Sequence, residues 1–369
     1  MLNKIVDVIV DRPLYSVHPK EKDLVYELNY GYIPNTISPV DKEEIDAYIL
    51  DVDQPVQSYK GRVIAIIHRF GDEDKLIVSN RDYSKEEIYK KTYFQEQYFK
   101  SYIEMAYTTK EDILFDLSQH GFKNTDTVLL HTSLKSFGAI EGKDILTAFK
   151  EYFSSGLVIL PTHSWSSITK NNDVFDVKKT PSCVGALTNL ALADAEFKRS
   201  LHPTHSVCAY GKKKEEYLKL DLNQSTPVSP TGCFGSLWKM DAKILFLGAP
   251  LSKNTLIHSI EEEMNVPDRF TKEIYHFTSI GYDGTYSYEM PRHYSTKREH
   301  LSENYTKLLP HLLEYEIAKE LYIGNSKTIL VYAKACYDYV KYLLEKNIHL
   351  FDDDKEYEDN YEGYKKTKQ

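Results

Sequence analysis

Hydrophobic and polar residues follow two different patterns along this chain of 369 residues. Up to about residue 90, short apolar runs such as residues 5–10 and 62–68 are rich in β-branched side chains. The segments at residues 29–35 and 51–55 are rich in the residue types that are typical of turns. β-Branched runs separated by turns predict strands. Residues 1–90 are therefore expected to form a small β-rich domain.

Residues 84–105 change to a mixture of charged and aromatic side chains that predicts a helix. Ser84 is expected at its N-cap, because Glu87 occupies the capping-box position three residues later. We expect this helix to bridge two domains, with residues 91–107 as the linker.

From Thr108 onward, apolar strands alternate with amphipathic helices. The expected strands are residues 127–131, 157–160, 206–210 and 243–247, and the expected helices are residues 143–154, 184–195, 233–240 and 255–264. This alternation predicts a layered α/β domain over residues 108–350. Residues 351–369 are polar and poor in aliphatic side chains, so a frayed or disordered tail is expected.

Composition narrows the classes of function. The chain has 55 acidic and 46 basic residues, a net charge of −9, which disfavours nucleic-acid binding through a bulk positive field. No apolar run reaches the roughly 18 residues of a membrane span. The four cysteines show no CxxC spacing, so neither a zinc knuckle nor a redox pair is expected. Four thiols in a chain of this length are typical of a reduced, cytoplasmic protein.

Four polar segments lie beside the predicted strands, at the strand-to-loop junctions where α/β enzymes hold their sites. They are HTSLKSFG (131–138), LPTHSW (160–165), RSLHPTHSVCAYG (199–211) and NTLIHSIEE (254–262).

The histidines of the last two segments are the candidate catalytic groups. His202 and His205 form an H-x-x-H pair on a loop that contains Pro203. No third metal ligand is close in sequence, so a general base is favoured over a metal site. His258 and Glu261 are three residues apart and share one face of a predicted helix, either as part of the site or as a surface ion pair.

Three of these segments, HTSLKSFG, RSLHPTHSVCAYG and NTLIHSIEE, together with SPTGCFGSLW (229–238) and KILFLGA (243–249), resemble the aminoglycoside 3-N-acetyltransferase family in order and spacing over residues 108–345. The resemblance implies an α/β fold and transfer of an acetyl group from acetyl-CoA to an amine. The acceptor is typically the 3-amino group of a 2-deoxystreptamine antibiotic, and family members differ in substrate. The expected partner is thus a small-molecule amine.

The chemistry of acetyl transfer needs a base, because an ammonium group has no lone pair with which to attack a thioester. A histidine, with an ordinary pKa of about 6.5, suits this task. His202 precedes Pro203 in the motif that resembles the family, and it is predicted to be the base, with His205 as the second candidate. Glu261 or His258 is expected to orient the base or to bind the cationic acceptor.

The loop after the first strand of this domain is expected to bind the coenzyme. Its backbone amides and the hydroxyl of Ser133 offer donors to a thioester oxyanion, and Lys135 or Arg199 adds positive charge near the diphosphate. The predicted coenzyme-binding residues are His131, Thr132, Ser133, Leu134, Lys135, Ser136 and Arg199.

A covalent route is an alternative. Cys208 and Cys233 flank the motifs, and a cysteine–histidine pair can carry an acyl group in two steps. Cys208 falls within a predicted strand, which favours a core position, so direct transfer is preferred.

The N-terminal segment has a second resemblance. VDRP (10–13), NYGYIPNT (29–36) and DKEEID (41–46) resemble the soluble inorganic pyrophosphatase family, which implies a small β-barrel with Mg²⁺-binding carboxylates. The matching positions are Asp41, Glu43 and Asp46, with Glu43 where the family has aspartate, and Arg12 and Tyr30 are candidate phosphate contacts. The alternatives to acetyl transfer are thus Mg²⁺-dependent diphosphate hydrolysis and a non-catalytic binding protein.

Overall fold

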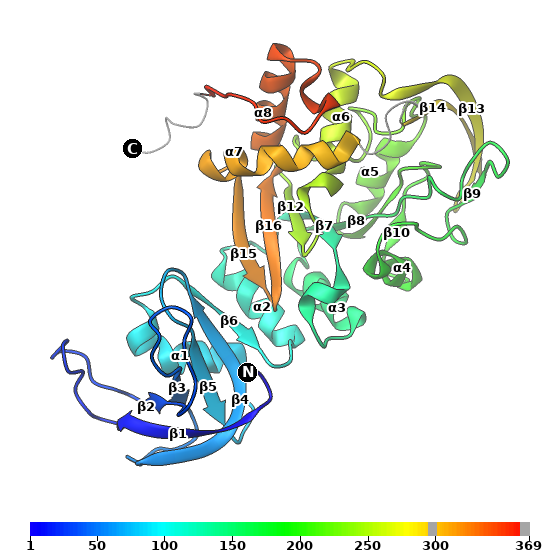
Figure 1. Cartoon of the computed structure of the whole chain (residues 1–369). Coiled ribbons are helices and arrows are strands. Elements are labelled where there is room, and N and C mark those ends of the chain that lie inside the picture. Colours follow the sequence, from blue (N-terminus) through cyan, green and yellow to red (C-terminus); the bar gives the residue numbers. More distant parts are fainter. Residues whose placement is uncertain (294–300, 362–369) are drawn as a thin grey trace. The chain divides into compact units, whose positions relative to one another are not determined.

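The computed structural model describes residues 1–293 and 301–361. These residues form two compact units, whose elements are labelled in Figure 1. The first unit comprises Met1–Gln119 together with Phe137–Ile140 and Tyr322–Asn325, and the second comprises the remaining residues.

The first unit is built on a closed barrel. Its strands are β1 (Ile5–Arg12), β2 (Asn29–Tyr32), β3 (Asp46–Ile49), β4 (Ser58–Arg69) and β5 (Lys75–Ser79). They pair in the order β1-β2-β3-β5-β4, and β4 pairs with β1 to close the ring. Closure leaves these strands without free edges, and their inward side chains form the core. The β-rich first domain is confirmed.

The predicted helix is shorter than expected, and the linker prediction is wrong. Helix α1 is Lys85–Glu96, and β6 (Ser101–Met105) follows it and pairs antiparallel with β4. In β6 the side chains of Ile103 and Met105 are buried in the barrel core, which is the two-residue period of a strand. Residues 91–107 therefore belong to the first unit.

The boundary between the units also lies further along the chain than predicted. Helix α2 (Lys110–Gln119) belongs to the first unit, where Phe115 packs against Tyr89 of α1 at 5.5 Å between ring centroids. The second unit begins at His120 rather than at Thr108.

A segment distant in sequence completes the first unit. The buried Lys85 side chain donates from Nζ to Asp116 at 2.7 Å and to the backbone oxygen of Gly324 at 3.0 Å. The Asn325 side chain accepts from Met105 N at 2.9 Å and donates to Met105 O at 2.8 Å. Asn325 thus satisfies both backbone groups of Met105 as a neighbouring strand would.

The capping box of α1 is present as predicted. Ser84 Oγ accepts from the backbone N–H of Glu87 at 3.3 Å, and Glu87 Oε2 accepts from the Ser84 N–H at 2.8 Å. Replacing Ser84 by alanine is expected to destabilise the helix end by about 1 kcal/mol, and amide exchange in the first turn should accelerate about fivefold. The exposed Ser58, replaced by alanine, is the control and should leave exchange in α1 unchanged. Equal exchange in both variants would contradict a role for the cap.

The second unit is built on a seven-stranded mixed sheet in the order β10-β11-β8-β7-β12-β16-β15. The strands are β7 (Thr127–Thr132), β8 (Leu157–Pro161), β10 (Lys198–Arg199), β11 (Val207–Gly211), β12 (Lys243–Leu247), β15 (Ala318–Ile323) and β16 (Ser326–Tyr332). β7 pairs parallel with both β8 and β12, whereas the β8–β11, β11–β10 and β12–β16 pairs are antiparallel. The four predicted strands are found at the centre of this sheet.

Helices cover the sheet. The α-helices are α3 (Gly142–Tyr152), α4 (Ala186–Ala193), α5 (Lys214–Leu218), α6 (Thr255–Glu263), α7 (Leu309–Glu314) and α8 (Ala333–Lys346). The 3₁₀ turns are η1 (Leu134–Phe137), η2 (Lys219–Asp221), η3 (Leu251–Lys253), η4 (Leu301–Leu308) and η5 (Leu350–Asp352). On one face of the sheet, alternate residues of the strands pack with α6 and α8 in one core. The intervening residues, which point to the other face, are buried as well, for example Val128 and Val158. Both faces are therefore covered, as expected for a sheet with a parallel centre.

One predicted helix is absent. Residues 233–240 form consecutive turns, and a Cβ atom on Gly235 would lie 2.5 Å from the backbone of Ser229 and Pro230. This close approach of two backbone segments explains why the chain turns here.

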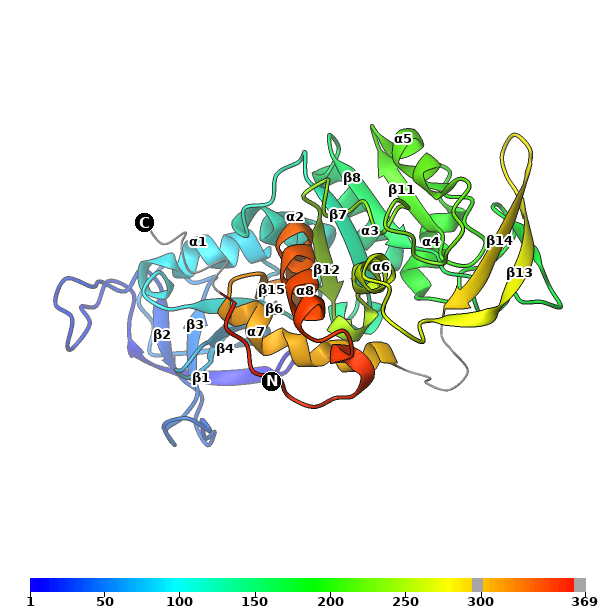
Figure 2. The same cartoon turned by 90° about the horizontal axis from the view of Figure 1, so that it is seen from above.

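A smaller sheet was not foreseen. Strands β13 (Phe270–Ile280) and β14 (Thr285–His293) form the long hairpin seen in Figure 2, and β9 (Val174–Asp176) pairs with β13. The hairpin follows α6 directly, and its second strand ends at His293. It thereby carries a histidine back toward that helix.

The prediction of a disordered tail is wrong for its first part. Phe351 is fully buried and packs against Tyr305 at 4.8 Å between ring centroids. Tyr357 donates or accepts a hydrogen bond with Tyr339 at 3.0 Å, and Tyr361 packs against the same ring. The tail is poor in aliphatic residues, but its aromatic residues pack against the second unit and hold the chain in place up to residue 361. Residues 362–369 lie outside the described part.

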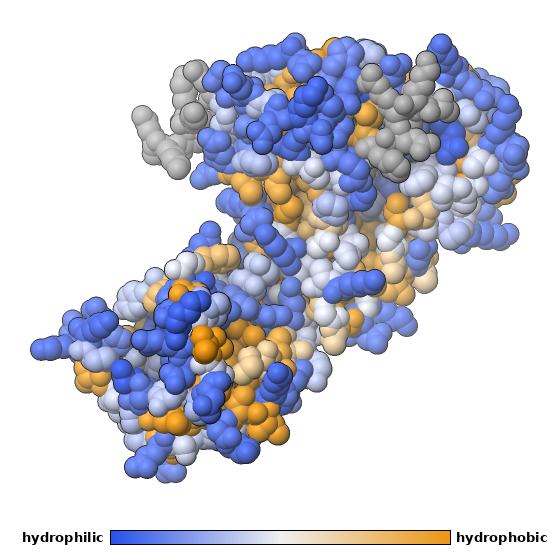
Figure 3. Space-filling view, in the orientation of Figure 1, coloured by the Kyte–Doolittle hydropathy of each residue, from blue (hydrophilic) through white to orange (hydrophobic). Residues whose placement is uncertain are grey.

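Charged and polar residues cover much of the surface, with apolar residues between them, as Figure 3 shows. Among the described residues, every helix is too short or too polar to cross a membrane.

Candidate active site

Five histidines from four segments of the second unit meet in one cluster. His163 follows β8, His202 and His205 lie between β10 and β11, His258 is on α6, and His293 ends β14. Ring centroids are 4.9 Å apart for His163 and His205, 6.2 Å for His205 and His293, and 4.2 Å for His258 and His293. A contiguous set of imidazoles on different elements is the geometry of a site rather than of a helix surface.

Most of these histidines are held neutral. Burial, followed by repulsion from neighbouring histidines, lowers the pKa of His163, His205 and His293 well below the ordinary value. Burial also lowers the pKa of His202. The cluster therefore offers neutral imidazoles, which can accept a proton or bind a metal ion.

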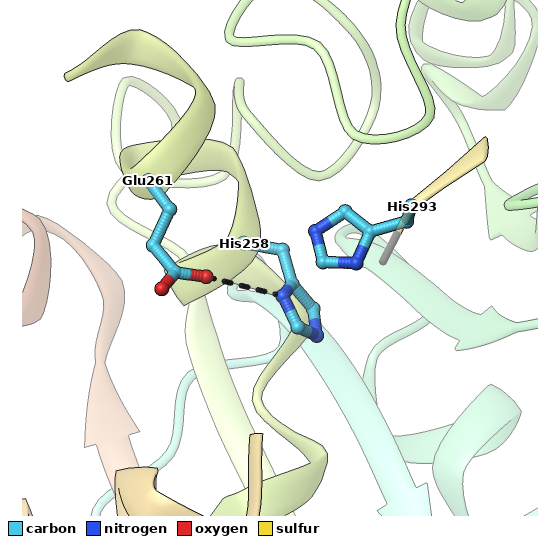
Figure 4. A group of neighbouring side chains, drawn as sticks. All are labelled: His258, Glu261 and His293. Carbon is cyan, nitrogen blue, oxygen red and sulfur yellow. Dashed lines mark ion pairs between the residues drawn. The ribbon is translucent and has the colours of Figure 1, made fainter. Parts of the chain in front are cut away.

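His258 and Glu261 form a dyad on one face of α6, as their spacing predicted (Figure 4). His258 Nδ1 lies 3.4 Å from Glu261 Oε2 and 2.8 Å from the hydroxyl of Tyr305. Tyr305 donates its single hydroxyl proton to Glu261. The hydrogen between His258 and Tyr305 must then come from Nδ1, which leaves the lone pair of the neutral imidazole on Nε2.

Glu261 is a buried carboxylate with a cationic partner. Arg269 Nε donates to Glu261 Oε1 at 2.7 Å, and both side chains are 1% exposed. Burial alone would raise the pKa of Glu261, but the hydrogen bond from His258 and the charge of Arg269 outweigh burial and lower this pKa. Glu261 is therefore ionised and can stabilise a positive charge on His258.

Arg269 is itself held by the C-terminal segment. Arg269 Nη2 lies 3.3 Å from Asp352 Oδ1, and Arg269 Nη1 donates to the backbone oxygen of Pro267 at 3.1 Å. Asp352, Arg269, Glu261 and His258 thus form one continuous series of contacts. Sequence reasoning missed Arg269, Asp352 and Tyr305, because none belongs to a recognised motif and Asp352 lay in the expected tail.

The structure contradicts the prediction that His202 is the base. His202 Nδ1 accepts from the backbone N–H of His205 at 3.0 Å and of Thr204 at 3.3 Å. Its hydrogen must then be on Nε2, which lies 3.2 Å from the backbone oxygen of Thr226. Backbone groups therefore bond to both ring nitrogens. His202 fixes the loop, and neither nitrogen has a lone pair left to take a proton from the attacking amine. His205, the second candidate, is partly exposed and contacts Thr204 Oγ1 at 3.0 Å.

Arg199 is also a structural residue, contrary to its prediction as a coenzyme ligand. Its buried guanidinium donates to the backbone oxygens of Thr162 and Thr180 and, at 3.0 Å, to Ser206 Oγ. Burial lowers its pKa to about 10. These bonds tie together three segments around the site and leave the guanidinium inaccessible to a diphosphate.

The loop after β7 is only partly available to a coenzyme. His131 is buried, stacks on Phe246 at 4.9 Å, and has its pKa lowered by burial to about 3, so its predicted contact is contradicted. The backbone N–H of Ser133 donates to Leu247 O at 2.9 Å, and Ser136 Oγ donates to Ser133 O at 2.8 Å. Of the predicted residues, Thr132, Ser133, Leu134 and Ser136 are partly exposed and Lys135 is exposed.

The cysteines do not fit a covalent route. Cys208 and Cys233 are fully buried, and burial raises the pKa of Cys208 to about 12 and that of Cys233 well above the ordinary value. A protonated, buried thiol is a poor nucleophile. This agrees with the preference for direct transfer.

The predicted magnesium ligands of the first unit do not converge. Asp41 and Glu43 are exposed, whereas Asp46 Oδ2 accepts from Lys75 Nζ at 2.7 Å and from the Tyr30 hydroxyl at 2.5 Å. Within residues 1–293 and 301–361, a metal-binding arrangement of His, Cys, Asp or Glu side chains is formed by His258, Glu261 and His293 alone. A lysine therefore neutralises the carboxylate that the pyrophosphatase resemblance assigned to Mg²⁺.

Comparison with known proteins agrees with the α/β unit. The family model for aminoglycoside 3-N-acetyltransferases matches residues 129–345, more than half of the chain. The SPbeta prophage-derived aminoglycoside N(3')-acetyltransferase-like protein YokD of Bacillus subtilis is 27% identical over 181 residues, which are 42% of this chain and 64% of YokD. Aminoglycoside N(3)-acetyltransferase III of Serratia marcescens is 25% identical over 206 residues, 49% of this chain and 74% of that protein.

A solved structure shares the fold. AAC-IIIb in a binary complex with CoASH superposes with a TM-score of 0.57 at 19% identity, covering 65% of this chain and 97% of that one. At this identity the likeness concerns the fold of the second unit. The barrel lies outside the residues that the family model matches.

Proposed function

Because the chain belongs to the aminoglycoside 3-N-acetyltransferase family of acyltransferases, we propose that it transfers an acetyl group from acetyl-CoA directly to an amine. The acceptor is an aminoglycoside, at the 3-amino group of its 2-deoxystreptamine ring, or a similar aminated small molecule. The observation that carries this proposal is the dyad of the partly exposed His258 and the buried Glu261 beside the cluster of neutral histidines.

His258 is the proposed general base. With Nδ1–H directed at Tyr305 and Glu261, its Nε2 can take the proton that the amine loses as it attacks the thioester carbonyl. The proton changes His258 into an imidazolium, and the ionised Glu261 stabilises that charge across 3.4 Å. Glu261 does not need to take the proton itself, because Arg269 keeps it ionised.

The partly exposed residues of the loop after β7 are the proposed coenzyme contacts. Lys135 offers a positive charge to the diphosphate, and Thr132 and Ser133 offer hydroxyl donors. Bound acetyl-CoA supplies the activated acetyl group, and the loop residues hold and orient it. His131 and Arg199 support this region from the core.

Release of free thiol from acetyl-CoA, followed with a panel of aminoglycosides and simpler amines, tests the proposal. Mass spectrometry should find one added acetyl group, and NMR should locate it on the 3-amino nitrogen where an aminoglycoside is accepted. Thiol release from no amine in the panel, with intact folded protein, would contradict the proposed activity.

Asp352 is expected to act through Arg269. In an Asp352→Asn variant, the neutral amide holds the Arg269 guanidinium less firmly, so Arg269 positions Glu261 less precisely against His258. Losses for such supporting partners are typically 10- to 100-fold at metal sites, and we expect about tenfold in kcat here. KM for acetyl-CoA should stay within about twofold. Asp338→Asn, at an exposed ion pair on α8, is the matched control and should keep the parent kcat. An unchanged kcat in Asp352→Asn would exclude this role.

The alternative of Mg²⁺-dependent diphosphate hydrolysis in the barrel lacks comparable support. A magnesium ion at Asp46 would have to displace Lys75, and Asp41 and Glu43 lie exposed.

A further inference from the structure

His258, Glu261 and His293 present one ligand atom each, and these three atoms lie within 4.8 Å of one another (Figure 4). Two residues come from one turn of α6, and the third is brought there by the β13–β14 hairpin. We propose that this trio binds a divalent transition-metal ion such as Zn²⁺, and that the bound ion inhibits acetyl transfer. The inhibition rests on the proposed function, whereas binding of the ion does not.

The spacing fits such an ion. Zn²⁺ binds histidine nitrogen and carboxylate oxygen at about 2.0–2.2 Å, so two ligands at a tetrahedral angle are about 3.3–3.5 Å apart. His258 Nδ1 and Glu261 Oε2 are 3.4 Å apart. The rings of His258 and His293 are 4.2 Å apart and nearly perpendicular, at 72°, so the two imidazoles approach the same volume from different sides.

The chemistry of the donors selects the class of ion. Two imidazoles and one carboxylate with an open fourth position are a frequent ligand set for Zn²⁺, whereas Mg²⁺ and Ca²⁺ prefer oxygen ligands alone. Metal ligands must be deprotonated. Each ligand atom must carry a lone pair, and neutral His258 offers one at Nδ1 when its hydrogen moves to Nε2.

The surrounding groups set the affinity. Tyr305 bonds to the same His258 Nδ1 and Glu261 Oε2 atoms that the ion would use, so the ion must displace its hydroxyl group, which weakens binding. The positive charge of Arg269, which is bonded to Glu261, repels a metal cation at the same carboxylate. The negative charge of Asp352 offsets only part of this repulsion. We therefore expect a dissociation constant on the order of micromolar, much weaker than that of a structural zinc site.

Coordination and catalysis compete for the same residues. A metal ion on His258 and Glu261 removes the ring from its hydrogen bond with Tyr305 and takes the base out of the reaction. Zn²⁺ should therefore inhibit acetyl transfer, and a chelator should restore it.

Isothermal titration of the full chain, freed of metal with EDTA, with ZnCl₂ tests the binding without any need for activity. We expect one ion per chain bound with micromolar affinity, a loss of at least about 30-fold in affinity in His293→Asn, and parent affinity in His276→Asn, an exposed histidine on β13. His258→Asn removes a second ligand and serves if His293→Asn does not fold, as judged by circular dichroism. Absence of a 1:1 site in the parent chain, or parent affinity in His293→Asn, would overturn the proposal.

Measuring acetyl transfer with and without Zn²⁺ tests the proposed inhibition. Inhibition that EDTA reverses and that His293→Asn weakens by the same factor as its binding supports the inference. Binding without inhibition of an active enzyme overturns the inhibitory role. Binding in a chain that acetylates nothing supports the site and overturns only the proposed function.

Discussion

A His258→Asn variant is expected to lose about 10³-fold in kcat for acetyl transfer, within the range of 10²–10⁴ for loss of a general base. Asparagine preserves a polar side chain near Tyr305 but cannot take the proton of the attacking amine. Thiol release from acetyl-CoA under saturating acceptor measures the loss. KM for acetyl-CoA should change little, since His258 acts in the transition state.

Two further variants separate the base from its neighbours. His276→Asn, at an exposed ion pair with Glu289, should keep the parent kcat. His202→Asn should destabilise the loop between β10 and β11 while leaving the kcat of the folded fraction within about tenfold, because His202 bonds only to backbone. A loss in His202→Asn as large as that expected for His258→Asn would instead restore the base predicted from the sequence.

The second large effect is loss of stability in acid. His131, His163 and His202 are buried and His205 is largely shielded, and removal from water lowers the pKa of each below the value of about 6.5 for an unfolded chain. Below pH 6.5 the unfolded state therefore binds more protons than the folded state, so stability is present above this pH and is lost as the pH falls. Each histidine contributes a slope of at most about 1.4 kcal/mol per pH unit, and the four together at most roughly 5 kcal/mol per pH unit, where the unfolded state is protonated and the folded state is not.

Typical domains are stable by about 5–15 kcal/mol, so the second unit is expected to unfold between about pH 4.5 and 5.5. Urea denaturation followed by tryptophan fluorescence from pH 5.5 to 7.5 measures the slope. His131→Phe keeps a ring against Phe246 and should reduce the slope by about 1.4 kcal/mol per pH unit at the acid end of this range. The exposed His276→Asn should not reduce it. A stability independent of pH in this window would contradict neutral, buried histidines.

The sequence predicted the central strands of the α/β unit, because each is a short apolar run after a clear turn or helix end. It also placed His258 and Glu261 on one helical face, where the structure has them. The β6 strand was missed because charged and aromatic residues of α1 continue into it without a break. Its two-residue burial period becomes visible only once Ile103 and Met105 have a barrel to pack against.

The roles of the histidines could not be read from spacing. His202 and His205 are the more conspicuous pair, yet the hydrogen bonds of His202 to its own loop remove it from chemistry. Conversely, His293 lies at the end of a hairpin that the sequence did not predict. Arg269 and Asp352 are in contact although they are 83 residues apart in the sequence. Contacts of this range are set by tertiary packing, and local sequence carries no signal for them.

The segment Tyr322–Asn325 has a consequence for how the protein is made. It belongs to the first unit, where Gly324 receives the Lys85 ammonium and Asn325 satisfies both backbone groups of Met105. During synthesis, the barrel leaves the ribosome long before residues 322–325 are made. Until residue 325 has also left the ribosome, Met105 and Lys85 of the first unit lack these hydrogen bonds. A fragment that ends at residue 119 would remain permanently in that unfinished state.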